Sequence, residues 1–156
     1  MAGPRIKILS VGKIKQDFVL AGEQEYLTRL KSFADIRLVE VPAQSEHPEA
    51  AMKELEAKAA LSKIDQGEYL IVLDERGKSR TSPEFAEWLQ GLLNQGRSQI
   101  CFAIGGSFGW EQSIKEKAQA VISLAPMTFT YQMTRLILIE QIYRAMTILK
   151  GIAYHK

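Results

Sequence analysis

The sequence is poor in the residues that build disulfide frameworks and metal sites. Its 156 residues include one cysteine and two histidines, so neither a disulfide nor a multi-cysteine metal site can form within one chain. Cys101 stands in an apolar segment and is expected to be a small buried side chain. His47 stands in a polar loop before Pro48, and no role is assigned to it. We therefore expect an activity that needs no metal ion.

The sequence also lacks a long apolar run. A membrane-spanning helix needs roughly 18 consecutive apolar residues, and no stretch reaches that length. The N-terminal residues, with Arg5 and Lys7 inside a strand-like alternation, do not have the layout of a signal peptide. These two features predict a cytoplasmic protein without a membrane anchor.

Acidic residues are scarce at both ends of the chain. Residues 1–16 contain four basic residues and no acid, and residues 117–156 contain five basic residues and Glu140 as their one acid. Because the net charge is only +2, the middle of the chain is acidic. A surface on which both basic ends meet would attract a polyanion such as RNA. Scattered solvated lysines explain the same distribution equally well.

Strand-like and helix-like segments alternate along the chain. Two nearly continuous apolar runs, at 69–74 and 99–104, are typical of strands covered on both faces. The alternation predicts one α/β domain, residues 1–156, with a mostly parallel sheet. The expected strands are 5–11, 36–41, 69–74, 99–104 and 121–124, and the expected helices are 18–30, 49–64 with Pro48 at its start, 83–94 with Ser82 as its cap, 111–119 and 132–150.

The last expected helix has almost no polar face, which predicts that it is buried on most sides. It is followed by Ala153-Tyr154-His155-Lys156, which offers a phenol, an imidazole and a cation. Chain ends are usually frayed and chemically plain. We therefore expect this tail to be held in place and used, against a second subunit, and a solvated tail is the alternative.

Two arginines of this helix are expected to have different roles. At about 100° per residue, Arg135 and Arg144 point in opposite directions, and Glu140 shares a face with Arg144. One arginine can therefore face a site while Arg144 pairs with Glu140. A purely structural ion pair between Glu140 and Arg144 is the preferred interpretation, because such pairs are frequent in helices.

Three loops follow the carboxyl ends of expected strands, where ligands bind in open α/β sheets. They are 73–78, 105–109 and 124–129. The glycine-rich loop 105–109 has neither the G-x-G-x-x-G spacing of a dinucleotide site nor the G-K-[ST] of a triphosphate site. Together the loops could form a crevice of backbone and apolar side chains, suited to an adenine ring and a neutral or cationic group. Each loop taken singly could also be an ordinary connection.

These loops and the tail together resemble the RlmH family of the SPOUT class, methyltransferases that act on N3 of a pseudouridine in large-subunit (23S) ribosomal RNA. The resemblance covers essentially the whole chain, and the order and spacing of its segments make it specific. The matching segments are Val11-Gly12-Lys13, Leu73-Asp74, Gly77-Lys78, Ile104-Gly105-Gly106 with Gly109, Met127-Thr128-Phe129, Glu140 to Ala145, and Ala153-Tyr154-His155-Lys156.

The resemblance implies a fold, a cofactor and an assembly. The fold would be an α/β SPOUT domain with a C-terminal trefoil knot, although chains are generally unknotted. The protein would form a homodimer in which the tail of one subunit helps to complete the site of the other. The cofactor would be S-adenosylmethionine, held by the backbone around Leu73, Gly105, Leu124, Ala125, Pro126, Met127, Thr128 and Phe129.

The resemblance also suggests catalytic residues. Arg135 would stabilise the imide anion of the base or position the RNA, and Tyr131 would hydrogen-bond the base or the cofactor. Tyr154 and His155 of the partner subunit would close the site. Lysines such as Lys13 would hold RNA phosphates without reading the sequence.

One departure from the family pattern concerns position 131. Many family members carry a histidine two residues after the matched phenylalanine, whereas this chain has Tyr131. A phenol, with a reference pKa of about 10, is a poor base at neutral pH but can donate or accept a hydrogen bond. Two alternatives therefore stay open. One is a catalytically impaired knotted RNA-binding protein, and the other is a flavodoxin-like enzyme that binds a flavin or phosphate ligand and ignores RNA.

Overall fold

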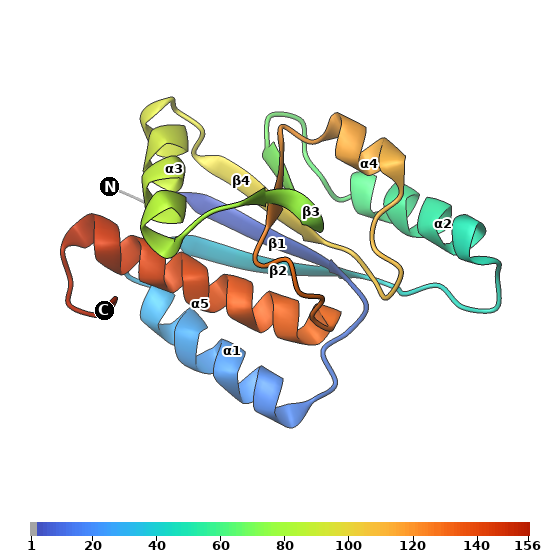
Figure 1. The fold of residues 1–156 in the computed structure, drawn as a ribbon, viewed down its shortest axis with the longest axis horizontal. Coiled ribbons are helices and arrows are strands. Elements are labelled where there is room, and N and C mark those ends of the chain that lie inside the picture. The colour runs from blue at the N-terminus through green and yellow to red at the C-terminus, as the bar shows by residue number, and fades with distance from the viewer. Residues whose placement is uncertain (1–2) are drawn as a thin grey trace.

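A five-stranded sheet lies between two layers of helices (Figure 1) in the computed structural model, which describes residues 3–156. Strands and helices alternate from one end of the chain to the other, which confirms the predicted α/β class. The strands are β1 (Arg5–Val11), β2 (Asp35–Val41), β3 (Tyr69–Ser79), β4 (Gln99–Ile104) and β5 (Ala120–Ser123), and the helices are α1 (Asp17–Leu30), α2 (Glu49–Leu61), α3 (Ser82–Asn94), α4 (Gln112–Lys117) and α5 (Tyr131–Lys150).

The strand order is β2-β1-β4-β3-β5, and every neighbouring pair is parallel. A flavodoxin-like sheet has the order 2-1-3-4-5. The flavodoxin-like alternative is therefore wrong, because β3 and β4 exchange places. The exchange puts β3 between β4 and β5, so that the ends of these three strands are neighbours.

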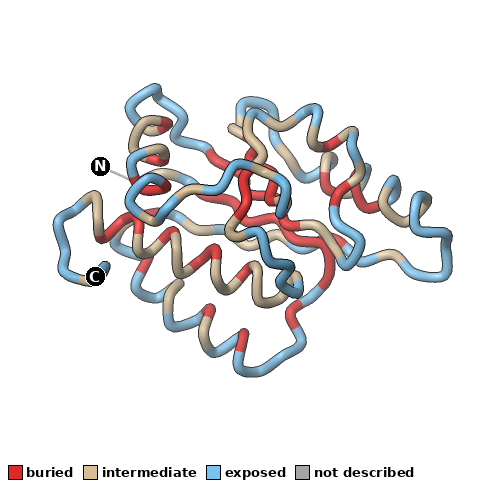
Figure 2. Tube along the Cα trace, viewed as in Figure 1, coloured by how far each residue is buried: buried red, intermediate tan, exposed pale blue. Residues whose placement is uncertain are grey.

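Alternate side chains of the sheet pack against different helices. On one face, Ile8 and Phe102 belong to a core shared with α1, α3 and α5. On the other face, Leu9 and Ala103 pack with α2 and α4. Strands β1 and β4 are therefore buried almost throughout (Figure 2), as expected of strands covered on both faces.

Strand β3 runs further than the sequence predicted. It was expected to end at Asp74, because the following residues are polar, but it continues to Ser79. It pairs with β5 through 71–73 and again through 78–79, with an irregularity between the two stretches. Gly77 makes the second stretch possible, because a Cβ there would lie 2.6 Å from the carbonyl carbon of Ile122.

Several helix ends also differ from the prediction. The N-cap of α3 is Thr81, not Ser82, and its hydroxyl accepts a hydrogen bond from the backbone N–H of Glu84. The Glu84 carboxylate accepts one in return from the Thr81 N–H, so the two residues form a capping box. Helix α2 ends at Leu61, with Pro48 as its N-cap, and α4 ends at Lys117.

Helix α5 is buried on most sides, which confirms the prediction from its sequence. It packs between α1 and α3, and its buried side chains lie along the face toward the sheet. Met133, Ile137 and Arg144 lie along another face and are only partly buried. In Figure 2 almost the whole helix is buried or intermediate. The pattern is apolar on nearly every side because α5 has helices on both flanks as well as the sheet beneath it.

Candidate active site

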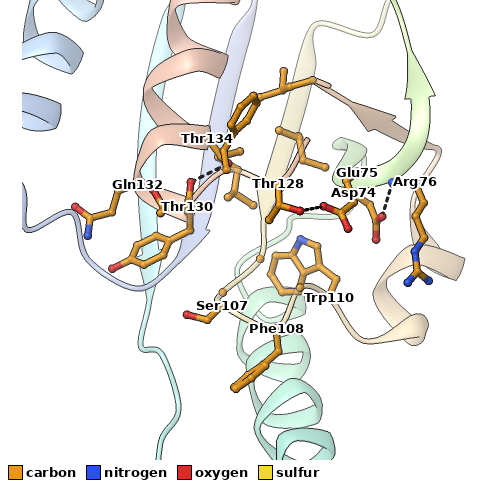
Figure 3. A pocket seen from close by; sticks show the side chains of 18 of the residues that line it. Asp74, Glu75, Arg76, Ser107, Phe108, Trp110, Thr128, Thr130, Gln132 and Thr134 are labelled. Atoms are coloured by element: carbon orange, nitrogen blue, oxygen red, sulfur yellow. Dashed lines mark hydrogen bonds between the residues drawn. The ribbon is translucent and has the colours of Figure 1, made fainter. Parts of the chain in front are cut away.

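A cavity of about 840 Å³ opens where β3, β4 and β5 end (Figure 3). Its walls come from the loops after these three strands, from the start of α5 and from the first turns of α2. The lining residues are Gln16, Glu49, Lys53, Leu73, Asp74, Glu75, Arg76, Ile104, Gly105, Gly106, Ser107, Phe108, Gly109, Trp110, Lys115, Leu124, Ala125, Met127, Thr128, Phe129, Thr130, Tyr131, Gln132 and Thr134.

Asp74 anchors one wall of the cavity. Its carboxylate lies 2.5 Å from Lys115 Nζ and accepts a hydrogen bond of 2.8 Å from the Arg76 N–H. Burial alone would raise the pKa of Asp74, but these hydrogen bonds and the nearby positive charges hold it below its usual value. The carboxylate is therefore charged at neutral pH and fixes the turn after Leu73.

A contact between side chains joins two of the loops. The Thr128 hydroxyl donates to the Glu75 carboxylate, and Figure 3 shows the two side chains pointing toward one another. On the β5 side, the Ser123 hydroxyl donates to the carbonyl of Ala125 at 2.7 Å. These bonds hold the segment after β5 against the end of β3, so the cavity has a defined wall on this side.

The glycine-rich loop forms a tight turn. The N–H of Gly109 donates to the carbonyl of Gly106 at 3.0 Å, and Gly109 has a φ of +78°, which favours glycine. Trp110 is buried, and its indole N–H donates to the carbonyl of Ala103 at 3.1 Å. Phe108, at the tip of the turn, stays 52% exposed.

The start of α5 forms the opposite wall. Thr130 is the N-cap, and its hydroxyl accepts a hydrogen bond from the Met133 N–H. The Tyr131 hydroxyl donates to the Lys13 carbonyl at 2.7 Å. The Gln132 side chain accepts from the N–H groups of Lys15 and Gln16. The basic loop after β1 is thereby tied to the rim of the cavity.

Most residues predicted to hold the cofactor meet in this cavity. Seven of the eight line it, and Pro126 does not. The seven are Leu73, Gly105, Leu124, Ala125, Met127, Thr128 and Phe129. Of the residues predicted to be catalytic, Tyr131 alone lines the same cavity.

Arg135 lies elsewhere, in a buried network. Its side chain is 3% exposed and forms a bidentate pair with Glu23, at 2.5 and 2.8 Å. It also contacts Glu40 at 2.8 Å and the Ser10 hydroxyl at 3.2 Å. Burial would lower the pKa of Arg135, but the two carboxylates raise it. In this arrangement the guanidinium joins α5 to α1, β1 and β2 and does not face the cavity, so it is placed as a structural group.

The C-terminal tail folds back on the far end of α5. The Tyr154 hydroxyl contacts the Glu140 carboxylate at 3.0 Å and the Tyr26 hydroxyl at 3.4 Å. Burial and these contacts raise the pKa of Tyr154. His155 Nδ1 lies 3.1 Å from Arg144, which also pairs with Glu140 at 2.6 Å. The predicted pairing of Arg144 with Glu140 is thus confirmed, and the tail is held in place within its own chain.

The tail and the cavity are at opposite ends of one helix. The 20 residues of α5 span roughly 30 Å. Figure 1 shows the C-terminus beyond one end of α5 and the loop from β5 entering the other end. A single chain therefore does not bring Tyr154 and His155 to the cavity that contains Tyr131.

Sequence reasoning missed several residues of the site. Lys115 is in none of the expected site sets, and Glu75 was expected only as a member of the loop 73–78, yet each holds part of the wall. Thr130 could have been found, because a threonine directly before an apolar helix is a standard N-cap signal. Lys53 and Glu49 reach the cavity from α2, and no local pattern indicates that contact.

The described side chains include no group of three or more histidine, cysteine, aspartate or glutamate residues that could hold a metal ion. No described helix combines the length and apolar character needed to cross a bilayer.

Comparison with known proteins identifies similar sequences and folds. A family model described as a predicted SPOUT methyltransferase matches residues 5–155. The chain is 42% identical over 158 residues to the ribosomal RNA large subunit methyltransferase H of Halothermothrix orenii, covering 97% of this chain and 99% of that protein. It is 44% identical over 156 residues to the protein of the same name from Pelotomaculum thermopropionicum, covering 96% and 98%. A probable methyltransferase from Bordetella pertussis Tohama I shares the fold, with a TM-score of 0.59 and 13% identity over 92% of this chain and 95% of that one.

Proposed function

Because this chain belongs to the SPOUT methyltransferase family and is a methyltransferase, we propose that it methylates N3 of a pseudouridine in large-subunit ribosomal RNA. The names of the similar proteins support the RNA substrate. The observation that carries the proposal is the cavity in which three strand-end loops and the start of α5 meet. A ribosomal substrate would place the enzyme in the cytoplasm.

The cavity suits S-adenosylmethionine as the methyl donor. Its volume of about 840 Å³ leaves space for a nucleobase beside the cofactor. Backbone around Leu73, Gly105 and 124–129 would hold the adenosyl group, and the carboxylates of Asp74 and Glu75 would favour a positive charge. When bound, the cofactor supplies a methyl group on a sulfonium, which needs no metal ion.

The protein's own contribution is orientation and proton handling. N3 of the base carries an imide proton, which must leave so that the nitrogen lone pair can accept the methyl group. His155 of a second subunit would take this proton, since a neutral imidazole nitrogen can accept one. Tyr154 would remain protonated, because its pKa is raised, and would donate a hydrogen bond to the base. Tyr131 would line the base or cofactor side of the cavity.

Arg135 is proposed to position, not to touch, the reacting groups. Its bond to Glu23 fixes α5 on α1, and its bonds to Ser10 and Glu40 fix α5 on β1 and β2. The start of α5, four residues earlier, is a wall of the cavity. A shift of this wall by even one ångström would misalign the base and the methyl group.

A homodimer is proposed because, within one chain, Tyr154 and His155 contact Glu140 and Arg144, which lie roughly 14 to 20 Å along α5 from Tyr131 at the cavity. The partly buried outer face of α5, with Met133 and Ile137 near one end and Arg144 near the other, is suited to an antiparallel contact with a second copy. Such a contact would bring one tail to the other chain's cavity. We propose that residues 1–156 act as one domain. The trefoil knot around 124–129 is also a proposal, and it rests on the family resemblance.

The RNA would approach over the basic rim. Lys13 and Lys15 are exposed on the loop that Tyr131 and Gln132 hold at the cavity. They would bind phosphates and set the affinity and its salt dependence.

The test uses labelled S-adenosylmethionine with ribosomal particles from cells that lack this protein, followed by mapping of the labelled base. We expect one methyl group on a pseudouridine of the large-subunit RNA. A second test mixes two inactive variants, His155→Ala and the cavity-filling Thr128→Trp. If the sites are shared, an equal mixture would recover about a quarter of the wild-type activity. About half of the dimers would be mixed, and one of the two sites in each mixed dimer would be intact. No recovery after verified subunit exchange would contradict the shared site.

A second candidate has one observation in its favour. Tyr131 stands where many family members have histidine, and its hydroxyl is engaged by the Lys13 carbonyl. A catalytically impaired RNA-binding protein would bind ribosomal particles and transfer no methyl group. The same labelling experiment separates the two functions.

A further inference from the structure

Exposed apolar side chains gather at the mouth of the cavity. Seven large apolar side chains are exposed among the described residues, and Phe108, Met127 and Phe129 of these line the cavity. Met127 and Phe129 belong to the segment proposed to hold the cofactor. Phe108 has no proposed partner, although an exposed phenylalanine at a functional cavity calls for one.

The turn presents Phe108 in a fixed position. The hydrogen bond from the Gly109 N–H to the Gly106 carbonyl closes the turn. The buried Trp110 side chain donates to the Ala103 carbonyl and so fixes the chain directly after the turn. A side chain held in this way loses little freedom when a ligand binds it. In Figure 3 the Phe108 ring points away from Asp74, Glu75 and Thr128 and toward α2. It therefore lies on the side of the cavity away from the polar cluster that the proposed cofactor would face.

Lys53 of α2 lines the same cavity. It forms no ion pair with any residue between 3 and 156. A flat aromatic ring with a cation nearby is the combination by which proteins bind single-stranded RNA, because the ring stacks on a base and the cation holds a phosphate. Glu49, one turn earlier in α2, also lines the cavity and reduces the positive charge. The ring should therefore contribute more to binding than the lysine.

We propose that Phe108 and Lys53 form a subsite for an unpaired nucleotide next to the one that is methylated. The inference rests on the proposed function, since it assumes that RNA reaches the cavity. The methylated base must lie against the cofactor. A ring that points away from the polar cluster is placed to stack on a neighbouring base, and such stacking accepts any base because every base has a π face.

The test measures methyl transfer to ribosomal particles with three variants: Phe108→Leu, Phe108→Trp and Lys53→Gln. We expect Phe108→Leu to raise the KM for RNA roughly 5- to 150-fold, the range seen for loss of one stacked base. Its kcat and its calorimetric affinity for S-adenosylmethionine should stay within about twofold of the wild type. Phe108→Trp should retain the wild-type KM, and Lys53→Gln should raise KM less and lower the slope of log KM against log salt by about one.

Two control variants change similar side chains outside the cavity. Leu55→Ala removes an exposed apolar side chain from α2, and Lys58→Gln removes an exposed lysine from the same helix. Both should leave KM unchanged. Thermal unfolding of all five variants should match the wild type, because the altered side chains are exposed or partly exposed.

The possible failures are distinguishable. If Phe108→Leu weakens cofactor binding and leaves the KM for RNA unchanged, the ring belongs to the cofactor site and the subsite is wrong. Unchanged KM in both Phe108→Leu and Lys53→Gln also overturns it, while the proposed function stands. If the wild-type protein transfers no methyl group to any ribosomal particle, the proposed function fails and the subsite fails with it.

Discussion

The two ends of helix α5 carry similar chemical groups in different surroundings. At its start, Thr130, Tyr131 and Gln132 are bound to the neighbouring loops and form a wall of the cavity. At its end, Tyr154 and His155 are held by Glu140 and Arg144, and neither residue lines a described cavity. The start of α5 belongs to a formed cavity, whereas its end holds a phenol and an imidazole outside that cavity. Under the proposed function, a single chain would bind the methyl donor, and the tail of a second chain would complete the site.

The largest effect should come from the tail. Replacing His155 by alanine should lower turnover by about 10²- to 10⁴-fold, the usual contribution of a positioned base, and leave cofactor affinity unchanged. Steady-state methyl transfer and calorimetry measure the two quantities. His47→Ala is the matched control, because the other histidine lies outside the cavity, and it should have no effect. Unchanged turnover in His155→Ala would remove the imidazole from the mechanism.

The next effect concerns the role of Arg135. Its replacement by alanine leaves the buried carboxylate of Glu23 without its partner and should lower the free energy of unfolding by about 3–5 kcal/mol. Urea unfolding measures this loss. Arg29→Ala is the control, because the exposed pair of Arg29 with Glu25 should contribute little to stability. A stable Arg135→Ala protein without turnover would instead mean that the guanidinium acts on the RNA.

A smaller effect is expected where β3 passes β5. Gly77→Ala places a Cβ 2.6 Å from the backbone of Ile122, so it should cost about 1–3 kcal/mol and weaken cofactor binding by moving the loop after Leu73. Gly91→Ala is the control within α3. Nothing lies within 4 Å of a Cβ at Gly91, and there alanine should stabilise the protein by about 0.5–1 kcal/mol. Equal effects at both positions would contradict the close approach.

The smallest effect should be that of the Asp74 carboxylate. Its lowered pKa means that it stabilises the fold above the pKa of the unfolded chain, near 4, and loses this contribution as the pH falls through the lower pKa of the folded state. Asp74→Asn should therefore be about 1 kcal/mol less stable at pH 7. The difference from wild type should shrink below about pH 4 in urea unfolding at a series of pH values. A difference that does not depend on pH would mean that the charge of Asp74 is not the cause.

Local patterns predicted the fold class and the three strand-end loops that line the cavity. Strand β4 lies where its apolar run placed it, because a strand covered on both faces must be apolar along its length, and β1 lies where the alternation at 5–11 placed it. The continuation of β3 to Ser79 was missed, because its residues after Asp74 are polar and only the backbone of β5 holds them. The predicted burial of α5 on most sides is confirmed, but periodicity did not show that α1, α3 and the sheet are the neighbours that cover it.

The sequence by itself determined the alternation of strands and helices, the family, and the set of loops that could form a crevice. These properties depend on side chains close together in the chain. Only the tertiary structure decided that Arg135 pairs with Glu23, 112 residues away, and that the tail folds back onto Glu140 and Arg144 and does not reach the cavity. The reason is physical: an ion pair between distant residues and the separation of two sites depend on how helices pack across the sheet, and no short stretch of sequence contains that geometry.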